Sequence, residues 1–458
     1  MRLGHNRSEG FRRRSVRSLE EDLRPVVAHL IRRSGFGATP EEIDAAAERG
    51  YADAVADLLG APDTCEGLGQ GPRPPHFDHR PLSVDPDLVV RRKATDEAAE
   101  QGRQLAGWWL ERMVRASPAL VEKRTFFWHS HFATSIHKVG SAHLMLRQNI
   151  ALRRLGSGDF GKLAAAMVTD PAMIVWLDAE AATKDAPNEN LAREVMELFT
   201  IGLGGYAEAD VHEAARALTG LRVDQSTGRY VFEPSAHDPG TKEVFGLRGS
   251  FGAGDLVALL VDRPASHRFV VTRLWNRFAA PGPPPPDVLG RLLDAYGPGR
   301  NIHAVLRALF LDPAFTGPHA RGALVKQPVE YVVGVLRALG IGVGSDAGEE
   351  RTAVLVTLSR LGQAPFAPPH VGGWPQGRAW LTTATAQARL DFAQWAAARA
   401  DIRPIASRTA RSRPDHVARM LGVADGWTAR TRTALERVVR DPRSLLTAAL
   451  VSPEYLVN

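Results

Sequence analysis

The sequence predicts an all-α fold: a single large multi-helix domain with one small β-hairpin near residues 221–233 and long loops rich in proline and glycine. Three observations support this prediction. Polar residues followed by proline recur along the chain, which is typical of helix starts. Apolar residues recur at helical spacing over most of the sequence. The stretch 221–233 differs, because it alternates β-forming residues around Ser226-Thr227-Gly228 as a hairpin does.

The helix starts can be read from local chemistry. Thr39-Pro40-Glu41-Glu42 combines a hydroxyl cap, a proline in the first helical turn and a glutamate three residues after the cap, which together predict a capping box. Ser117-Pro118, Asp170-Pro171 and Arg263-Pro264 repeat the pattern of a residue followed by proline, although arginine is a poor cap.

In chain order, a charged tail over residues 1–22 is expected to be disordered, and one helical domain is expected over 23–458. Residues 62–87 have no apolar period and predict a long loop, and PGPPPP at 281–286 predicts a stiff connector. Apolar spacing predicts helices over 88–116, 117–132, 141–155, 159–169, 188–200, 208–218, 264–279, 301–311, 328–340, 349–361, 382–400, 414–421 and 425–452.

Composition excludes several classes of protein. The net charge of +6 is dispersed over 458 residues without a basic stripe, which argues against nucleic-acid binding. The single cysteine, Cys65, excludes an intrachain disulfide and any site with several cysteine ligands. No run approaches the ~18 apolar residues of a membrane span. Arg12-Arg13-Arg14 is followed by charged residues rather than an apolar segment, so a signal peptide is rejected and the cytoplasm is the expected compartment.

The helix predicted over 188–200 carries acids beside its apolar stripe. Asn190, Glu194 and Glu197 are four and three residues apart and share one face. A buried carboxylate must be paired, protonated or bound to a metal. One interpretation is structural, with Arg193 or Arg216 as the partner. The other makes Glu194 and Glu197 catalytic acids or metal ligands.

Two histidines, His129 and His131, follow an aromatic cluster. Together with Glu194 and Glu197 they are the candidate ligands of a divalent metal, and His and carboxylate without thiolate favour zinc, iron or manganese. Residues two apart lie about 200° apart on a helix, so both imidazoles share a metal only if the backbone turns. The alternative is that both histidines pack in the core.

A third candidate is His237-Asp238, followed by Lys242, in a loop. Here Asp238 is expected to orient an imidazole, which makes His237 and Asp238 candidate catalytic residues. Asp238-Pro239-Gly240 is equally typical of a simple turn. A proline-rich segment at 362–380 is interpreted as a cover of the core, or else as the wall of a pocket.

Several segments also carry a resemblance to a known family. They are HLIRRSGFGATPEE at 29–42, FFWHSHFATS at 126–135, DPAMIVWLD at 170–178, NENLAREVMELFTIGLGG at 188–205, HDPGTKEVFG at 237–246, KQPVEYVVGVLRALG at 326–340 and LGQAPFAPPHVGGWPQGRAWL at 361–381. In this order the sequence resembles the bacterial domain of unknown function 1800 family from about residue 23 to the end. The resemblance implies a mostly helical domain and no activity. Arg263 stands where that family usually has His.

Two hypotheses of function follow. The first is a metal- or acid/base-dependent enzyme, an oxidoreductase or a hydrolase of unknown substrate, with its site in the helical core. The second is a non-catalytic assembly protein, since the resemblance implies a sulfatase-like protein encoded nearby as a partner. Walker-type and dinucleotide-binding glycine loops are missing, which argues against nucleotide binding by those routes.

Overall fold

The computed structural model describes residues 23–60, 71–79, 87–344 and 347–458. The tail predicted over 1–22 and most of the loop predicted over 62–87 lie outside the described residues. Helices make up 62% of the chain, which confirms the predicted fold class. Across the described ranges, no helix is both long enough and apolar enough to cross a membrane.

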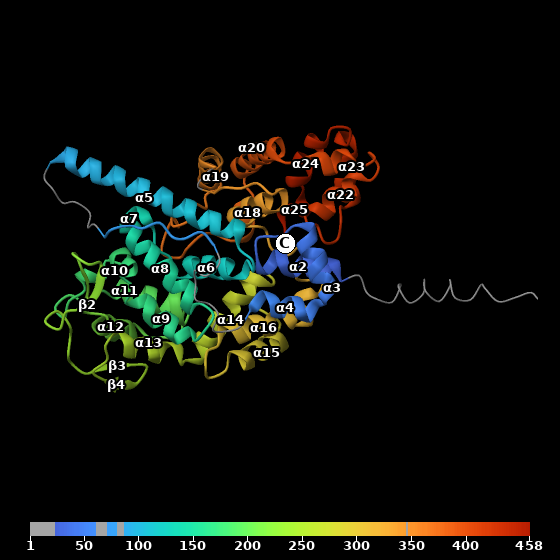
Figure 1. Cartoon of the computed structure of the whole chain (residues 1–458). Helices are drawn as coiled ribbons and strands as arrows, with labels where there is room; N and C mark the ends of the chain where they lie inside the picture. The colour runs from blue at the N-terminus through green and yellow to red at the C-terminus, as the bar shows by residue number, and fades with distance from the viewer. Residues whose placement is uncertain (1–22, 61–70, 80–86, 345–346) are drawn as a thin grey trace, which may run out of the picture.

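The N-terminal part consists of helices that pack beside one another (Figure 1). They are α2 (Arg24–Ser34), α3 (Pro40–Arg49), α4 (Tyr51–Leu59), the long α5 (Leu88–Arg115), α6 (Leu120–His131), α7 (Ile136–Val139) and α8 (Ala142–Leu155). The predicted capping box is confirmed: the Glu42 N–H donates to Thr39 Oγ1, and the Thr39 N–H donates to Glu42 Oε2 at 2.8 Å.

The middle of the chain contains short helices and two hairpins. The helices are α9 (Phe160–Val168), α10 (Pro171–Trp176), the 3-10 helix η1 (Ala179–Ala181), α11 (Glu189–Arg193), the π-helix η2 (Glu194–Thr200), α12 (Glu208–Ala217), α13 (Ala253–Val261), α14 (Pro264–Phe278), α15 (Pro286–Tyr296), α16 (Ile302–Leu311) and α17 (Pro313–Thr316). As predicted, Asp170 caps α10 through the Met173 N–H, whereas the Arg263 side chain makes no cap.

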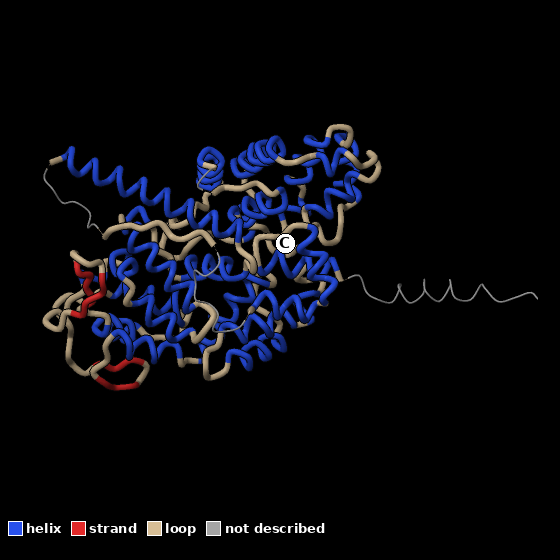
Figure 2. The backbone as a smooth tube through the Cα atoms, in the orientation of Figure 1, coloured by secondary structure: helices blue, strands red, loops and turns tan. Residues whose placement is uncertain are grey.

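The β structure lies at one edge of the molecule (Figure 2). Strands β1 (Leu221–Asp224) and β2 (Arg229–Phe232) pair antiparallel, which confirms the predicted hairpin. A second hairpin of β3 (Lys242–Val244) and β4 (Leu247–Gly249) was not predicted. Its strands have three residues each, which is short for a sequence pattern. Phe245 and Gly246 both have positive φ in its turn, and this pair is not the Asn-Gly or Asp-Gly dipeptide that predicts such a turn from sequence.

The C-terminal part is helical again. It comprises α18 (Pro328–Leu339), α19 (Gly348–Arg360), the 3-10 helix η3 (Gly377–Trp380), α20 (Thr383–Arg399), α21 (Arg403–Ala406), α22 (Arg413–Met420), α23 (Ala429–Val438), α24 (Pro442–Leu450) and α25 (Pro453–Leu456). The helix predicted over 425–452 is two helices, because Asp441-Pro442 starts α24 with the carboxylate as cap.

Two hydrophobic cores hold these helices together, and α6 contributes to both. Phe126 packs with α18 and α20 residues in one core, whereas Phe127 and Trp128 pack in the other with residues of α9 and α14. Accordingly, α6 lies between the upper and lower groups of helices in Figure 1. Polar side chains of α6 are therefore buried between two apolar layers.

One of these polar side chains, Glu122, joins three helices. Arg153 Nη2 lies 2.5 Å from Glu122 Oε2, and Arg112 Nε lies 3.0 Å from Oε1. The Trp109 indole N–H also donates to the carboxylate, at 2.9 Å. All four side chains are buried, so this carboxylate compensates two guanidinium groups that water cannot reach.

We expect Glu122→Gln to lower the free energy of unfolding by about 3–5 kcal/mol, because two buried cations lose their counter-charge. Urea denaturation at pH 7 measures this loss. The control is Glu436→Gln on the exposed side of α23, which should change stability by less than about 0.5 kcal/mol. Equal effects of the two substitutions would contradict the role assigned to Glu122.

Candidate functional site

The two predicted acids lie in the π-helix η2, and both are half-buried. The wider turn is visible in its hydrogen bonds: the Ile201 N–H donates to Met196 O at 2.8 Å, and the Thr200 hydroxyl donates to Val195 O at 2.7 Å. Single π turns inside helices are frequent at functional sites. The local geometry therefore sets Glu194 and Glu197 apart from the acids of the regular helices.

Their partners differ from the arginines expected from the sequence. The Tyr206 hydroxyl donates to Glu197 Oε1. Burial raises the pKa of the Glu194 carboxyl, and the positive charge of Lys138 opposes this rise. Arg193 instead pairs with Glu208, and Arg216 pairs with Asp238 and Glu213. Ion pairs of Glu194 and Glu197 with these arginines are therefore not formed, whereas the pairing of Arg216 with Glu213, three residues before it, is present, and Arg193 also lies 3.9 Å from Glu189.

The predicted histidines are buried on opposite sides of α6. His129 lies among the rings of Trp109, Phe366 and Trp374, at centroid distances of 5.3–5.5 Å. Neither of its ring nitrogens has a hydrogen-bond partner among the described residues, and burial lowers its pKa to about 3.

His131 faces the other core. It packs against Phe132 and Phe160, and its Nε2 lies 2.9 Å from Phe199 O. Burial holds the pKa of His131 well below its usual value. Both imidazoles are therefore neutral core side chains at neutral pH.

The structure does not gather the four predicted metal ligands, His129, His131, Glu194 and Glu197. Within the described ranges, no three His, Cys, Asp or Glu side chains are grouped so that they could hold a metal ion. The reason is helix geometry: α6 stays regular through His131, so residues two apart point into different cores.

The loop after the first hairpin does not use Asp238 to orient His237. Arg216 Nε donates to Asp238 Oδ2 at 2.7 Å, and this bond contributes most to holding the pKa of Asp238 at about 2. The His237 Nδ1 instead lies 3.0 Å from Thr219 O. Lys242 Nζ donates to Asp238 O at 2.6 Å. These contacts fasten the loop to α12, so the expected pairing of Asp238 with an imidazole is wrong.

A cavity that the sequence did not predict lies where the two cores meet. Its volume is about 410 Å³. Its deepest side chains are Arg33 from α2, Lys123 from α6, Arg277 from α14 and Glu330 from α18, all of them buried. The remaining lining residues are Asn276, Pro281, Gly282, Ala323, Leu324, Val325, Gln327, Gln376, Gly377, Arg378 and Asn458. Exposed residues among these, including Gly282 and Arg378, form its rim.

Glu330 anchors the floor of this cavity, which we call the basic cavity. Its Oε1 lies 2.5 Å from Lys123 Nζ and 2.9 Å from Arg277 Nη1. Burial raises the pKa of Glu330, but Arg277 and Lys123 outweigh burial and hold it at about 2. Burial lowers the pKa of Lys123 to about 7, against the opposing effect of Glu330. The short Lys123–Glu330 contact is an ion pair.

Arg33 forms no ion pair with a carboxylate of the described residues, and Glu330 acts on its charge only from a longer distance. Its side chain is 1% exposed and donates one hydrogen bond, to Ala320 O. Its Nε and Nη1 have no partner in the described part of the chain, and neither does Arg277 Nη2. Three buried cations thus share one carboxylate, although an uncompensated buried charge is costly.

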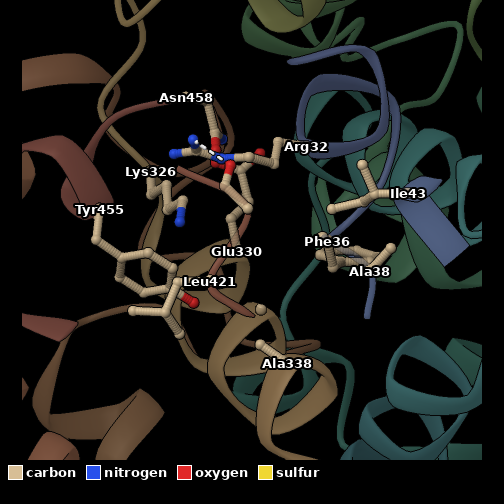
Figure 3. Close-up of a pocket in the computed structure, with 13 residues that line it drawn as sticks. Arg32, Phe36, Ala38, Ile43, Lys326, Glu330, Ala338, Leu421, Tyr455 and Asn458 are labelled. Atoms are coloured by element: carbon tan, nitrogen blue, oxygen red, sulfur yellow. Dashed lines mark hydrogen bonds between the residues drawn. The ribbon is translucent and has the colours of Figure 1, made fainter. Parts of the chain in front are cut away.

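A smaller pocket of about 10 Å³ adjoins the basic cavity and shares Glu330 and Asn458 with it (Figure 3). Figure 3 shows the Lys326 amino group pointing toward Tyr455, and Nζ lies 3.4 Å from the ring centroid. Burial holds the pKa of Lys326 well below its usual value. Arg32, on the same wall, donates to Gly422 O at 3.0 Å. Basic side chains therefore continue beyond the cavity floor.

Sequence reasoning missed the basic cavity because its residues are far apart in the chain. The sequence also gives no local signal for them, because Arg33 stands between Arg32 and Ser34, and Lys123 stands between Glu122 and Arg124, as residues of a solvated helix face do. The segment 362–380 has both of the roles considered for it. Trp374 and Trp380 are buried in the core, whereas Gln376 and Arg378 line the cavity.

Comparison with known proteins identifies the family. A family model described as a protein of unknown function (DUF1800) matches residues 29–457, so the chain belongs to this family. No curated protein and no solved structure matches the chain. Three of the segments on which the resemblance rested, 29–42, 326–340 and 361–381, contribute Arg33, Gln327, Glu330, Gln376 and Arg378 to the basic cavity.

The buried histidines predict a loss of stability in mild acid. An unfolded histidine takes up a proton near pH 6.5, whereas folded His129 stays neutral until about pH 3. The unfolded state therefore binds more protons as pH falls below 6.5, and stability falls by up to about 1.4 kcal/mol per pH unit for each such histidine. Burial lowers the pKa of His29 to about 3 as well, and it adds to the slope.

Urea unfolding between pH 7.5 and 5.0 measures this slope. His129→Phe keeps an aromatic ring in the same surroundings. In this variant the slope of the unfolding free energy against pH should fall by up to the amount that corresponds to one proton taken up on unfolding. The variant His137→Phe, at an exposed position of α7, should keep the slope of the unsubstituted protein. An unchanged slope in His129→Phe would contradict the neutral state assigned to His129.

Proposed function

We propose that the chain binds a small organic anion in the basic cavity. The observation that carries this proposal is Arg33, a buried guanidinium whose Nε and Nη1 find no acceptor among the described residues and which lines a cavity of about 410 Å³. An anion seated there accepts these hydrogen bonds and supplies the missing counter-charge. The volume fits a small metabolite, since ligand pockets usually measure about 300–1,000 Å³.

We further propose that the chain is an acid/base-dependent enzyme that acts on the anion bound in the basic cavity. The Lys123–Glu330 pair lies on the cavity floor and combines a proton donor with a proton acceptor. The lowered pKa of Lys123, about 7, supports proton transfer near neutral pH. The proposed acid/base residues are therefore Lys123 and Glu330 rather than His237 and Asp238. The metal-dependent alternative lacks a grouped ligand set among the described residues.

A second candidate site for acid/base chemistry is the π-helix η2. The supporting observation is that Glu194 is half-buried with a raised pKa in a π-helical turn. This proposal retains Glu194 and Glu197 as catalytic candidates. A substitution distinguishes this site from the basic cavity. Glu194→Gln should abolish a turnover that depends on η2 and should leave anion binding in the basic cavity unchanged.

The proposal of a non-catalytic assembly protein has one supporting observation. Strand β2 exposes the apolar side chains of Tyr230, Val231 and Phe232, and Leu247 of the second hairpin is also exposed. Exposed apolar side chains that cluster can mark a protein interface. Co-purification with the sulfatase-like protein encoded nearby, lost in Phe232→Ser and retained in the unsubstituted chain, would favour this candidate.

We expect isothermal titration at pH 7 to detect binding of at least one of phosphate, sulfate, citrate or glucose 6-phosphate with a Kd below about 1 mM. Arg277→Gln should weaken that binding at least tenfold, because a hydrogen bond to a charged group contributes about 1.5–3 kcal/mol. The control Arg154→Gln changes an exposed arginine of α8 outside the cavity and should leave the Kd unchanged. The absence of binding by all four anions would contradict the proposal.

A further inference from the structure

We infer that the ligand of the basic cavity is a phosphate monoester, with its phosphate held between Arg33 and Arg277 above Lys123 and its neutral body directed toward the rim. This inference rests on the proposed function, because it names the chemical class of ligand for the same site. It follows from the donors, the charges and the shape of the cavity.

The number of free donors fits a group with several terminal oxygens. Arg33 Nε, Arg33 Nη1 and Arg277 Nη2 are three buried N–H donors without partners among the described residues. Two of them belong to the Arg33 guanidinium, where they lie on either side of Nη2, which donates to Ala320 O; their N–H bonds diverge, so each reaches a different acceptor. A phosphate monoester can accept from one N–H of Arg33 and from Arg277 Nη2 and still offers a third terminal oxygen toward Lys123, whereas a carboxylate has only two oxygens.

The charge balance favours a dianion. Arg33 and Arg277 contribute two positive charges to the floor, and Lys123, whose pKa of about 7 a bound anion would raise, contributes a third; Glu330 contributes one negative charge. The Glu330 carboxylate is already paired with Lys123 and Arg277. A phosphate monoester carries about −1.5 to −2 charges at pH 7, which closely balances the surplus of two. A sulfate ester or a carboxylate carries one charge and leaves part of the surplus uncompensated.

The cavity also requires a ligand body. A volume of about 410 Å³ exceeds what a bare phosphate occupies, so inorganic phosphate would leave most of it unfilled. Away from the floor, the lining offers the amides of Asn276, Gln327 and Gln376, and Asn276 Oδ1 has no partner among the described residues. Neutral amides suit hydroxyl groups, so the body that fits is uncharged and hydroxylated, as a small sugar is.

The first test compares ligands that share a body and differ in charge. The full chain is titrated in chloride buffer at pH 7.5 with glucose 6-phosphate, glucose 6-sulfate, glucuronate and glucose. We expect glucose 6-phosphate to bind at least tenfold more tightly than the sulfate ester and glucuronate, and glucose to show no binding. Inorganic phosphate, the other source of the same group, should bind at least tenfold more weakly than the ester.

The outcomes separate the two proposals. Binding of glucose 6-sulfate or glucuronate as tightly as glucose 6-phosphate overturns the phosphate assignment and leaves anion binding standing. Equal binding of inorganic phosphate overturns the monoester assignment. If none of these charged ligands binds and citrate and sulfate also fail to bind, the proposed function itself fails; binding of citrate or sulfate alone overturns the phosphate assignment only.

The second test uses Arg33, whose charge has no carboxylate partner in the described chain. Arg33→Met keeps the length and apolar contacts of the side chain and removes the charge, so the melting temperature without ligand should stay the same or rise. Affinity for glucose 6-phosphate should fall at least tenfold. Arg33→Lys keeps the charge and loses the guanidinium donors Nε and Nη1, so its affinity should be intermediate. Unchanged affinity in Arg33→Met, with Arg154→Met as the matched control, would overturn the inference.

Discussion

The Glu330 carboxylate is the interaction on which the arrangement of this protein depends. It lies on α18, and it meets Lys123 of α6 and Arg277 of α14 across the junction of the two cores. Each partner comes from a different layer of helices, so this one carboxylate joins the layers. Because it is buried, its interactions are screened little by salt, and removing it would leave two cations without water or counter-charge.

The same junction contains the cavity that we propose as a binding site. Glu122 also compensates the charges of two guanidinium groups. In that cluster neutral oxygens accept the remaining N–H donors: Arg153 donates to Asn149 Oδ1 at 2.6 Å, and Arg112 donates to Pro72 O at 3.2 Å. Around Glu330, by contrast, Arg33 and Arg277 keep N–H donors without acceptors beside a cavity. The guanidinium donors of the first cluster find acceptors within the protein, whereas in the proposed function an anion from outside supplies the acceptors of the second. The proposal therefore assigns stability and binding to neighbouring sets of buried charges.

Much of the fold could be predicted because its signals are local. Thr39 with Glu42 forms the expected capping box, and the alternation around Ser226-Thr227-Gly228 marks the first hairpin. The site could not be predicted in the same way. Arg33, Lys123 and Arg277 are brought together by tertiary packing, and no spacing in the sequence connects them. The more conspicuous pattern, His129 and His131, was divided between the two cores by the regular geometry of α6.

The central claim is that an anion completes the surplus of buried positive charge around Glu330. A crystal structure of the protein grown with glucose 6-phosphate tests this most directly. The account predicts density for a phosphate group within about 2.7–2.9 Å of both Arg33 and Arg277, with the sugar toward Gln376 and the rim. A structure in which the ester lies elsewhere, with Arg33 paired to a carboxylate of the chain itself, would contradict it.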